Sequence, residues 1–175
     1  MQKSCEKIKL LLSENKLFLM MITMMVILRF FVFSVYTVEG QSMDYTFTEG
    51  DRIIGVKHSH IDRFDIVTFH APGDKLYVKR VIGLPGDQIR YQDDQLYIND
   101  LPYEEPYLAQ KQAETLGNFT RDFEPAIVPE GYYFVLGDNR RNSTDSRQLG
   151  FIETSQLDAE VKFRIWPLDQ WAYFD

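Results

Sequence analysis

Cysteine is nearly absent from this sequence, since Cys5 is the only one among 175 residues. A single cysteine excludes an intrachain disulfide and a metal site built on cysteine ligands. Histidine is scarce as well, with only His58, His60 and His70 in the chain. His58 and His60 resemble a weak metal pair, but no third ligand and no Ser-His-Asp arrangement is evident. We therefore expect no metal and no cofactor, and a domain stabilised by its hydrophobic core alone.

Basic residues are too few to balance the acidic ones, and the chain has a formal net charge of −7. The charges are unevenly placed. Residues 1–36 carry four lysines and one arginine against two glutamates, a net +3, which leaves −10 on residues 37–175. An acidic domain of this kind argues against nucleic acid as a partner.

Charge is almost absent from residues 17–36, where Arg29 is the only charged residue in a mostly apolar run. About 20 such residues are enough to cross a bilayer as a helix. The excess of lysine before this run places residues 1–16 in the cytoplasm and residues 37–175 outside, by the positive-inside rule. The sequence thus predicts a single-pass anchor at 17–36 in the cell membrane, with the lipid bilayer as a partner and an extracytoplasmic domain.

A removable signal peptide is the alternative interpretation of residues 1–40. The apolar run is long for the hydrophobic region of a signal peptide, and Val38-Glu39-Gly40 matches a cleavage site only weakly. Cleavage there would also leave Ser42 at the new N-terminus. A retained anchor is the favoured interpretation.

After residue 36 the sequence changes to short apolar runs separated by turn residues. The runs are rich in β-branched and aromatic residues and have the length of strands. They cover residues 52–56, 65–69, 76–82, 88–91, 95–98, 132–136 and 161–166. Because no helical pattern separates them, they predict a mostly β fold, an antiparallel sheet or barrel-like domain. Residues 103–130 are the least regular part, and 110–116 favour a helical turn or two.

A lysine in the third of these runs lies among apolar residues. Lys79 is flanked by Tyr77, Val78, Val81 and Ile82. Burial among such neighbours disfavours the ammonium form and lowers the pKa of a lysine. A neutral lysine is able to act as the base that a serine hydroxyl needs to become a nucleophile. The alternative is a solvent-facing lysine on an edge strand, where its charge opposes aggregation.

Three sequence blocks favour the catalytic interpretation. One is Gly40-Gln41-Ser42-Met43, just after the apolar run, and another extends from Tyr77 to Asp87. The last is Gly137-Asp138-Asn139-Arg140-Arg141-Asn142-Ser143-Thr144-Asp145-Ser146-Arg147. Together they resemble the type I (leader) signal peptidases of bacteria. Members of that family are membrane-anchored serine endopeptidases (hydrolases) with serine as nucleophile and lysine as general base.

The resemblance implies a role for individual residues. Ser42 and Lys79 would form the catalytic dyad. Ser143 would form a hydrogen bond with the Lys79 amine and orient it. Asp145 and Arg147 would form an ion pair that supports the site. The fold implied is an antiparallel β peptidase domain behind one N-terminal transmembrane helix.

The implied substrates are exported preproteins, from which the enzyme removes the N-terminal signal peptide. The family selects small residues at positions −1 and −3 and binds the substrate as an added strand. By resemblance, that strand would lie beside residues 36–42 and 76–79 and contact Gly40, Gln41, Tyr77 and Val78.

The match departs from the family at two positions of the nucleophile block. The family motif is Ser-Met-x-Pro-Thr-Leu, and residues 42–47 place Tyr45 at the proline and Phe47 at the leucine. Loss of proline frees φ at that position, so we expect a differently shaped loop. Gly40 provides no side-chain donor for the oxyanion. The backbone N–H of Ser42 is then the evident donor, and the second is unassigned.

Two other functions stay open at this point. One is a specialised assembly factor or chaperone for surface structures such as pili that kept the peptidase fold, which the altered residues 42–47 suggest. The other is a self-cleaving Ser/Lys regulator of the repressor type. Retention of both Ser42 and Lys79 weighs against an inert protein. The apolar segment and the lack of a DNA-binding helix-turn-helix pattern weigh against the regulator.

Overall fold

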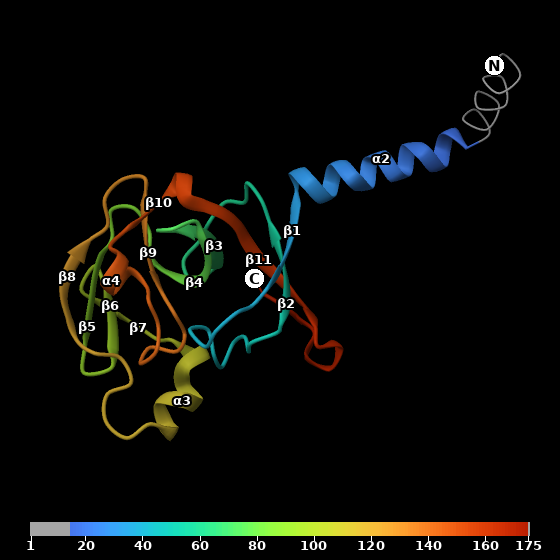
Figure 1. Cartoon of the computed structure of the whole chain (residues 1–175). Coiled ribbons are helices and arrows are strands. Elements are labelled where there is room, and N and C mark those ends of the chain that lie inside the picture. The colour runs from blue at the N-terminus through green and yellow to red at the C-terminus, as the bar shows by residue number, and fades with distance from the viewer. Residues whose placement is uncertain (1–14, 175) are drawn as a thin grey trace, which may run out of the picture.

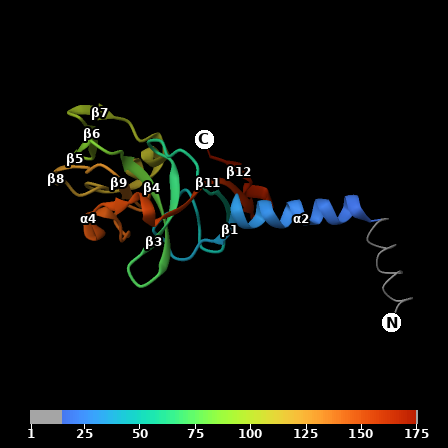
Figure 2. The same cartoon turned by 90° about the horizontal axis from the view of Figure 1, so that it is seen from above.

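A computed structural model describes residues 15–174 of the chain, in which a β-rich domain carries one N-terminal helix (Figure 1). The predicted cytoplasmic segment 1–16 lies outside the described residues except for its last two. The helix, α2, spans Lys16–Phe31 and projects away from the domain in both views (Figures 1 and 2). None of the helices among residues 15–174 has both the length and the hydropathy needed to cross a membrane.

The structure corrects the end of the predicted apolar helix. Residues 33–36 do not continue α2 but belong to strand β1, Phe33–Thr37, which pairs antiparallel with β2, Arg52–Val56. Their side chains alternate between exposed and half-buried, as in a strand with one covered face. Pairing with β2 also gives their backbone groups partners that a free helix end would lack.

The larger sheet contains eight antiparallel strands in the order β1-β2-β11-β3-β4-β9-β10, with β12 paired to β11. It confirms the predicted antiparallel β architecture, and its strand order has two ends, so it is an open sheet. The further bounds are β3 Ile66–Ala71, β4 Lys75–Gly83, β9 Tyr132–Leu136, β10 Ile152–Glu153, β11 Leu157–Trp166 and β12 Ala172–Tyr173.

A smaller, four-stranded antiparallel sheet has the order β7-β6-β5-β8. Its strands are β5 Gln88–Gln92, β6 Gln95–Ile98, β7 Leu101–Tyr103 and β8 Phe123–Ile127. The short helices are η1 Pro106–Leu108, α3 Ala109–Glu114, α4 Ser146–Leu149, η2 Thr154–Gln156 and η3 Leu168–Gln170. α3 corresponds to the helical turns predicted near residues 110–116.

Apolar side chains from the two sheets form one buried cluster at the junction. Ile82, Phe134 and Leu136 of the larger sheet pack with Ile89 and Leu96 of the smaller one. β4 leads into β5 through the turn at residues 84–87, so the two sheets share one continuous chain there. This junction holds the smaller sheet beside the segment that follows β9, where the third motif block lies.

Candidate active site

The loop that carries Ser42 is fixed by the hydrophobic core on both sides of the serine. Val38, Met43 and Phe47 are all buried, and they pack in one cluster with Ile53 of β2. The backbone N–H of Phe47 donates to the carbonyl of Met43 at 2.8 Å, which closes a tight turn just after the serine. Three buried side chains within ten residues leave Ser42 little freedom to move.

Lys79 of β4 reaches the serine hydroxyl directly. Its Nζ lies 2.7 Å from Ser42 Oγ and 2.8 Å from the carbonyl oxygen of Val78. Only 3% of Lys79 is exposed, and the ring of Tyr77 lies 5.0 Å from Nζ. The structure thus brings together the two residues that the motif blocks predicted as a dyad, although 37 positions separate them in sequence.

Burial lowers the pKa of Lys79 from 10.5 to about 8, because the ammonium form loses water in the folded site. The carboxylates of Asp145 and Asp138 favour the ammonium and oppose part of this effect. A lysine with this pKa is partly neutral in mildly alkaline solution. Its amine is then able to accept the proton of the hydroxyl that it contacts.

The segment after β9 clamps the nucleophile loop from the other side. The backbone N–H of Asn139 donates to the carbonyl of Ser42 at 3.0 Å, and its side-chain amide donates to the carbonyl of Gln41 at 2.9 Å. Thr46 donates its hydroxyl to the Asp138 carboxylate. The bonds from Asn139 hold the backbone at Gln41 and Ser42, and the bond from Thr46 holds the end of the same loop.

A groove extends from the dyad along the open edge of β4. It has a volume of about 720 Å³ and is lined on one side by residues 36–43 and on the other by residues 75–79, with Asn142 and Thr144 at the dyad end. β9 pairs with β4 only from Arg80 onward, whereas β3 covers the other edge of residues 75–79. The backbone of residues 75–79 is therefore open toward the groove. Gly40, Gln41, Tyr77 and Val78, the predicted substrate contacts, all line it.

The comparisons with known proteins show the family of this chain. Residues 11–166 match the sequence model of the family described as "Signal peptidase, peptidase S26". The chain is 48% identical over 157 residues to signal peptidase I of Bacillus caldolyticus, which covers 83% of this chain and 86% of the relative. It is 39% identical over 198 residues to signal peptidase I of Streptococcus pneumoniae, covering 93% and 97% of the two chains. The chain belongs to the S26 signal peptidase family.

A crystal structure of a signal peptidase I from Enterococcus faecalis matches the fold with a TM-score of 0.56 at 40% identity. The match covers 58% of this chain and 97% of the Enterococcus chain. The family assignment made from the three motif blocks is thereby confirmed.

Within this S26 peptidase, Asp145 and Arg147 form the expected ion pair. Arg147 Nη2 and Nε donate to the two oxygens of Asp145 at 2.7 and 2.8 Å. Burial raises the pKa of the Asp145 carboxyl, but Arg147 and the backbone N–H of Gly137 more than compensate, and the pKa lies below its ordinary value. Asp145 is therefore a carboxylate that ties the third block to the end of β9.

Ser143 does not make the hydrogen bond that the resemblance implied. Its Oγ is buried and has no hydrogen-bond partner among residues 15–174. Instead it packs against Gly137, where a Cβ would lie 2.2 Å from Ser143 Oγ and 2.5 Å from the carbonyl oxygen of Ser42. Because Val78 takes one donor of the Lys79 amine, that amine is oriented by the strand backbone in this structure.

The two departures from the family motif have structural counterparts. Tyr45 has φ of 88°, a value that the proline ring excludes, so the loop has a shape that proline would not permit. The Tyr45 ring lies 4.5 Å from Lys111 Nζ of α3 and 6.2 Å from the Phe119 ring. Phe47 is fully buried and meets the Phe174 ring edge-on at 5.0 Å. Phe47, which is larger than the leucine of the family motif, thus packs against the C-terminal segment.

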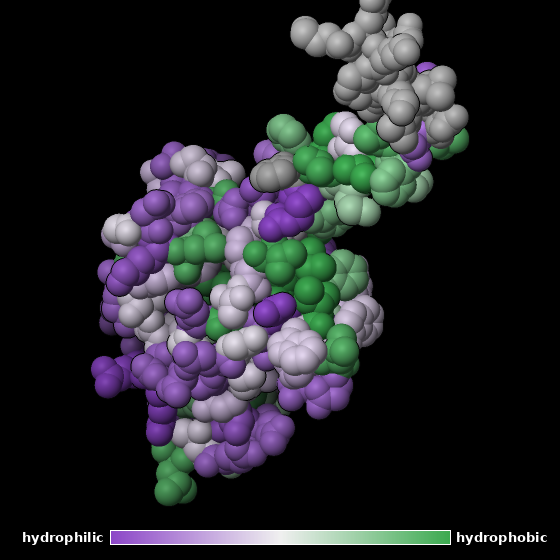
Figure 3. All heavy atoms as spheres, turned by 45° about the vertical axis from the view of Figure 1, so that its right-hand side comes forward, coloured by the Kyte–Doolittle hydropathy of each residue, from purple (hydrophilic) through white to green (hydrophobic). Residues whose placement is uncertain are grey.

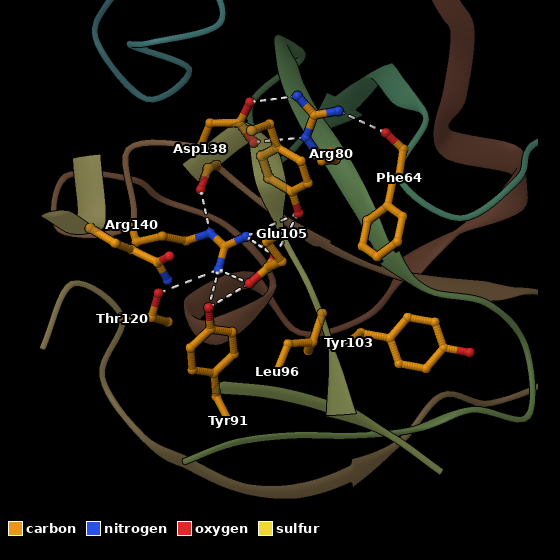
Figure 4. A network of polar contacts seen from close by, with 12 residues as sticks. Phe64, Arg80, Tyr91, Leu96, Tyr103, Glu105, Thr120, Asp138 and Arg140 are labelled. Carbon is orange, nitrogen blue, oxygen red and sulfur yellow. Dashed lines mark hydrogen bonds and ion pairs between the residues drawn. The ribbon is translucent and has the colours of Figure 1, made fainter. Parts of the chain in front are cut away.

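Sequence reasoning missed a buried polar network behind the dyad. Arg80 donates to both oxygens of Asp138, at 2.9 and 2.7 Å, and to the carbonyl of Phe64. Arg140 pairs with Glu105, a residue from the irregular segment near η1. Figure 4 shows the Arg80 guanidinium beside Asp138 and the Arg140 guanidinium beside Glu105 and Thr120. The only available signal was the position of Arg80 in an apolar strand and of Arg140 in the third block.

The network around Arg140 is closed by hydroxyl groups. Tyr91 and Tyr107 donate to Glu105, while Arg140 also donates to Thr120 Oγ1 at 3.3 Å and to the carbonyl of Gly137 at 3.1 Å. A buried charge pair is tolerable when its remaining donors and acceptors are satisfied in this way. Through the Gly137 carbonyl, the network supports the loop that clamps Ser42.

Proposed function

We propose that this S26 signal peptidase removes N-terminal signal peptides from exported preproteins with a Ser42/Lys79 dyad. The observation that carries the assignment is the 2.7 Å contact between Ser42 Oγ and the Nζ of a buried lysine whose pKa is lowered to about 8. A serine hydroxyl needs an adjacent base, and a neutral amine at this distance meets that requirement. No second base lies in contact with Ser42 Oγ among residues 15–174.

The reaction follows the usual course of acyl transfer. Neutral Lys79 accepts the hydroxyl proton while Ser42 Oγ attacks the scissile carbonyl carbon. The ammonium then gives this proton to the leaving amine, which becomes the N-terminus of the mature protein. Lys79 next takes a proton from water, whose hydroxide attacks the ester on Ser42. The bond to Ser42 Oγ then breaks, the ammonium returns its proton to this oxygen, and the leader peptide leaves with a new carboxylate.

The developing oxyanion needs hydrogen-bond donors. The backbone N–H of Ser42 has no acceptor among residues 15–174, so it is available for this purpose. One removed donor of this kind typically costs a factor of about 10² to 10³ in kcat. Gly40 has no side chain and therefore offers no side-chain donor to the oxyanion.

We propose that the leader peptide binds as an extra strand in the groove. The backbone of residues 75–79 is open on this side, and residues 36–41 lie opposite. Main-chain hydrogen bonds to both walls would align the scissile bond with Ser42 whatever the leader sequence. Tyr77, Val78, Gly40 and Gln41 would then shape the space for the small side chains at −1 and −3.

We also propose that the apolar segment beginning at residue 17 anchors the enzyme in the cell membrane, with residues 1–16 cytoplasmic and the β domain outside. Apolar side chains are exposed along α2, for example 69% of Met25 and 73% of Leu17. Figure 3 shows that this apolar surface continues onto the adjacent face of the domain. Phe33, Ile54 and Phe163 belong to that face. The change from +3 before residue 37 to −10 after it gives the orientation.

The catalytic assignment is tested with the full chain in detergent and a preprotein substrate. Wild type should release a mature protein whose new N-terminus is identified by mass spectrometry. Ser42→Ala and Lys79→Met should each lower the rate at least about 10³-fold. Ser155→Ala, an exposed serine in η2, is the matched control and should cleave like wild type. Cleavage at the wild-type rate by either dyad variant would refute the assignment.

The membrane topology is tested by protease added to intact cells whose wall has been removed. The β domain should be digested from outside, whereas an N-terminal tag should be protected until the cells are lysed. Digestion of the tag with protection of the domain would reverse the proposed orientation.

A further inference from the structure

A second cavity lies beside the active-site groove and is rich in arginine. It has a volume of about 450 Å³, and Arg121, Arg140, Arg141 and Arg147 line it. Such a concentration of positive charge is unexpected in a chain with a net charge of −7. Most of the other lining residues are polar as well, namely Asn118, Ser143 and Gln148, with Phe119 as the one aromatic residue.

Two of the four arginines have their charge neutralised and two do not. Arg140 pairs with Glu105 and Arg147 with Asp145. Arg141 donates only to the backbone carbonyls of Leu116 and Asn118, each at 2.9 Å. Arg121 has no hydrogen bond or ion pair to any residue in the range 15–174. The cavity therefore presents two exposed guanidinium groups that lack a carboxylate partner.

The position of this cavity indicates which part of the substrate it would contact, namely the part beyond the cleavage point. The two walls of the groove, residues 36–42 and 75–79, both lead toward the dyad, where Ser42 and Lys79 meet. A leader bound along these walls ends at Ser42. Asn142 and Thr144 also line the groove, and the Asn142 amide lies 3.5 Å from Gln41 Oε1, next to the nucleophile. We expect the chain that follows the scissile bond to leave past these residues.

Residues 142–144 form the partition between the two cavities. Asn142 and Thr144 face the groove, whereas Ser143, between them, lines the arginine-rich cavity. A substrate chain that crosses this short partition comes within reach of Arg121 and Arg141. An extended chain covers about 3.3 Å per residue, so roughly six residues after the scissile bond span up to 20 Å.

We propose that the arginine-rich cavity is a subsite for an acidic side chain in the first residues of the mature protein. The inference rests on the proposed function and adds a substrate preference to it. Arg121 and Arg141 would pair with an aspartate or glutamate carboxylate, for which the guanidinium group is well matched in shape and charge. Preproteins with an acidic residue after the cleavage site would bind more tightly than those with a lysine there.

The test uses one uncharged peptide scaffold with a single glutamate moved through the first six positions after the scissile bond. Glutamine and lysine at the same positions serve as isosteric and opposite-charge controls. At the best position, glutamate should raise kcat/KM about two- to fivefold over glutamine, as expected for an exposed ion pair, and lysine should lower it. The preference should weaken as salt is raised from 50 to 300 mM, because exposed charges are screened.

Charge-reversal variants distinguish a local contact at Arg121 from an effect of the net charge of the whole protein. Arg121→Glu should invert the order, so that the lysine peptide becomes the better substrate. Arg52→Glu is the matched control, since Arg52 is exposed in β2, lines neither cavity and changes the net charge by the same amount. The Arg52→Glu variant should keep the wild-type order of kcat/KM values for the three peptides. Equal kcat/KM for all three peptides, or the same change in both variants, would overturn the proposal.

Binding is measured independently of cleavage. In the Ser42→Ala variant, peptides stay intact, and fluorescence anisotropy should show the same order of affinities as kcat/KM shows in wild type. If the wild-type enzyme cleaved none of the peptides, this result would count against the proposed function alone. Equal affinity of the variant for glutamate and glutamine peptides would count against the subsite alone.

Discussion

Replacing Lys79 by methionine should abolish activity and at the same time make the fold less sensitive to pH. The lowering of the Lys79 pKa from 10.5 to about 8 corresponds to about 3 kcal/mol, since one pKa unit is worth about 1.4 kcal/mol. Below pH 8 the lysine is charged in both states, and the folded state bears the full cost of the buried ammonium. Between pH 8 and 10.5 the unfolded state holds more protons, so wild-type stability rises with pH. Above 10.5 the lysine is neutral in both states and the cost vanishes.

The assay is chemical unfolding of wild type and Lys79→Met in detergent at several pH values from 7 to 10.5. Wild type should gain about 3 kcal/mol relative to the variant over this range. The two hydrogen bonds lost in the variant shift its stability by a similar amount at every pH and drop out of the comparison. Lys75→Met, an exposed lysine in the same strand, should show a difference from wild type that stays constant with pH. A constant difference for Lys79→Met as well would refute the claim that burial lowers this pKa.

Three further results are expected. In wild type, kcat/KM on a peptide should rise with pH along a limb centred near 8, because neutral Lys79 is the active base; a midpoint near 10.5 would remove that role. Gly137→Ala should lower kcat/KM about 100-fold, because its Cβ would lie 2.5 Å from the Ser42 carbonyl and displace the nucleophile. Gly83→Ala, crowded only by side chains far from the dyad, should lose stability but keep most activity, as rates and thermal unfolding will show. Tyr45→Pro should destabilise the fold by about 1–3 kcal/mol, since proline cannot adopt φ of 88°, whereas Tyr45→Gly should stay within about 1 kcal/mol of wild type in the same unfolding assay.

The sequence alone was sufficient for the family and the reaction class, and it pointed to two residues, Ser42 and Lys79, that the structure brings into contact. Ser42 and Lys79 each lie in a contiguous block, and the third block from Gly137 to Arg147 is complete. Information of this kind is local, because the chemistry requires particular residue types at fixed short spacings. The mostly antiparallel β architecture followed for the same reason, since β-branched and aromatic runs between turn residues express a local preference for strands.

Other features depended on contacts between distant parts of the chain. The apolar run of the helix extends through Phe33 and Val35, and pairing with β2 places residues 33–37 in a strand. The bond expected from Ser143 to Lys79 is absent, and the amine contacts the Ser42 hydroxyl and the Val78 carbonyl instead. Composition could not indicate either outcome, since both depend on which backbone groups meet in the folded chain.

Charge shows the same division between sequence and tertiary structure. The net −7 and the contrast between the two ends of the chain were readable at once, and they indicated an acidic domain behind a basic N-terminus. That Arg80 and Arg140 are buried with carboxylate partners, whereas Arg121 and Arg141 face a cavity without one, was decided only by folding. A residue's type sets its charge, but its partners and its access to water are properties of the surfaces that the fold brings together.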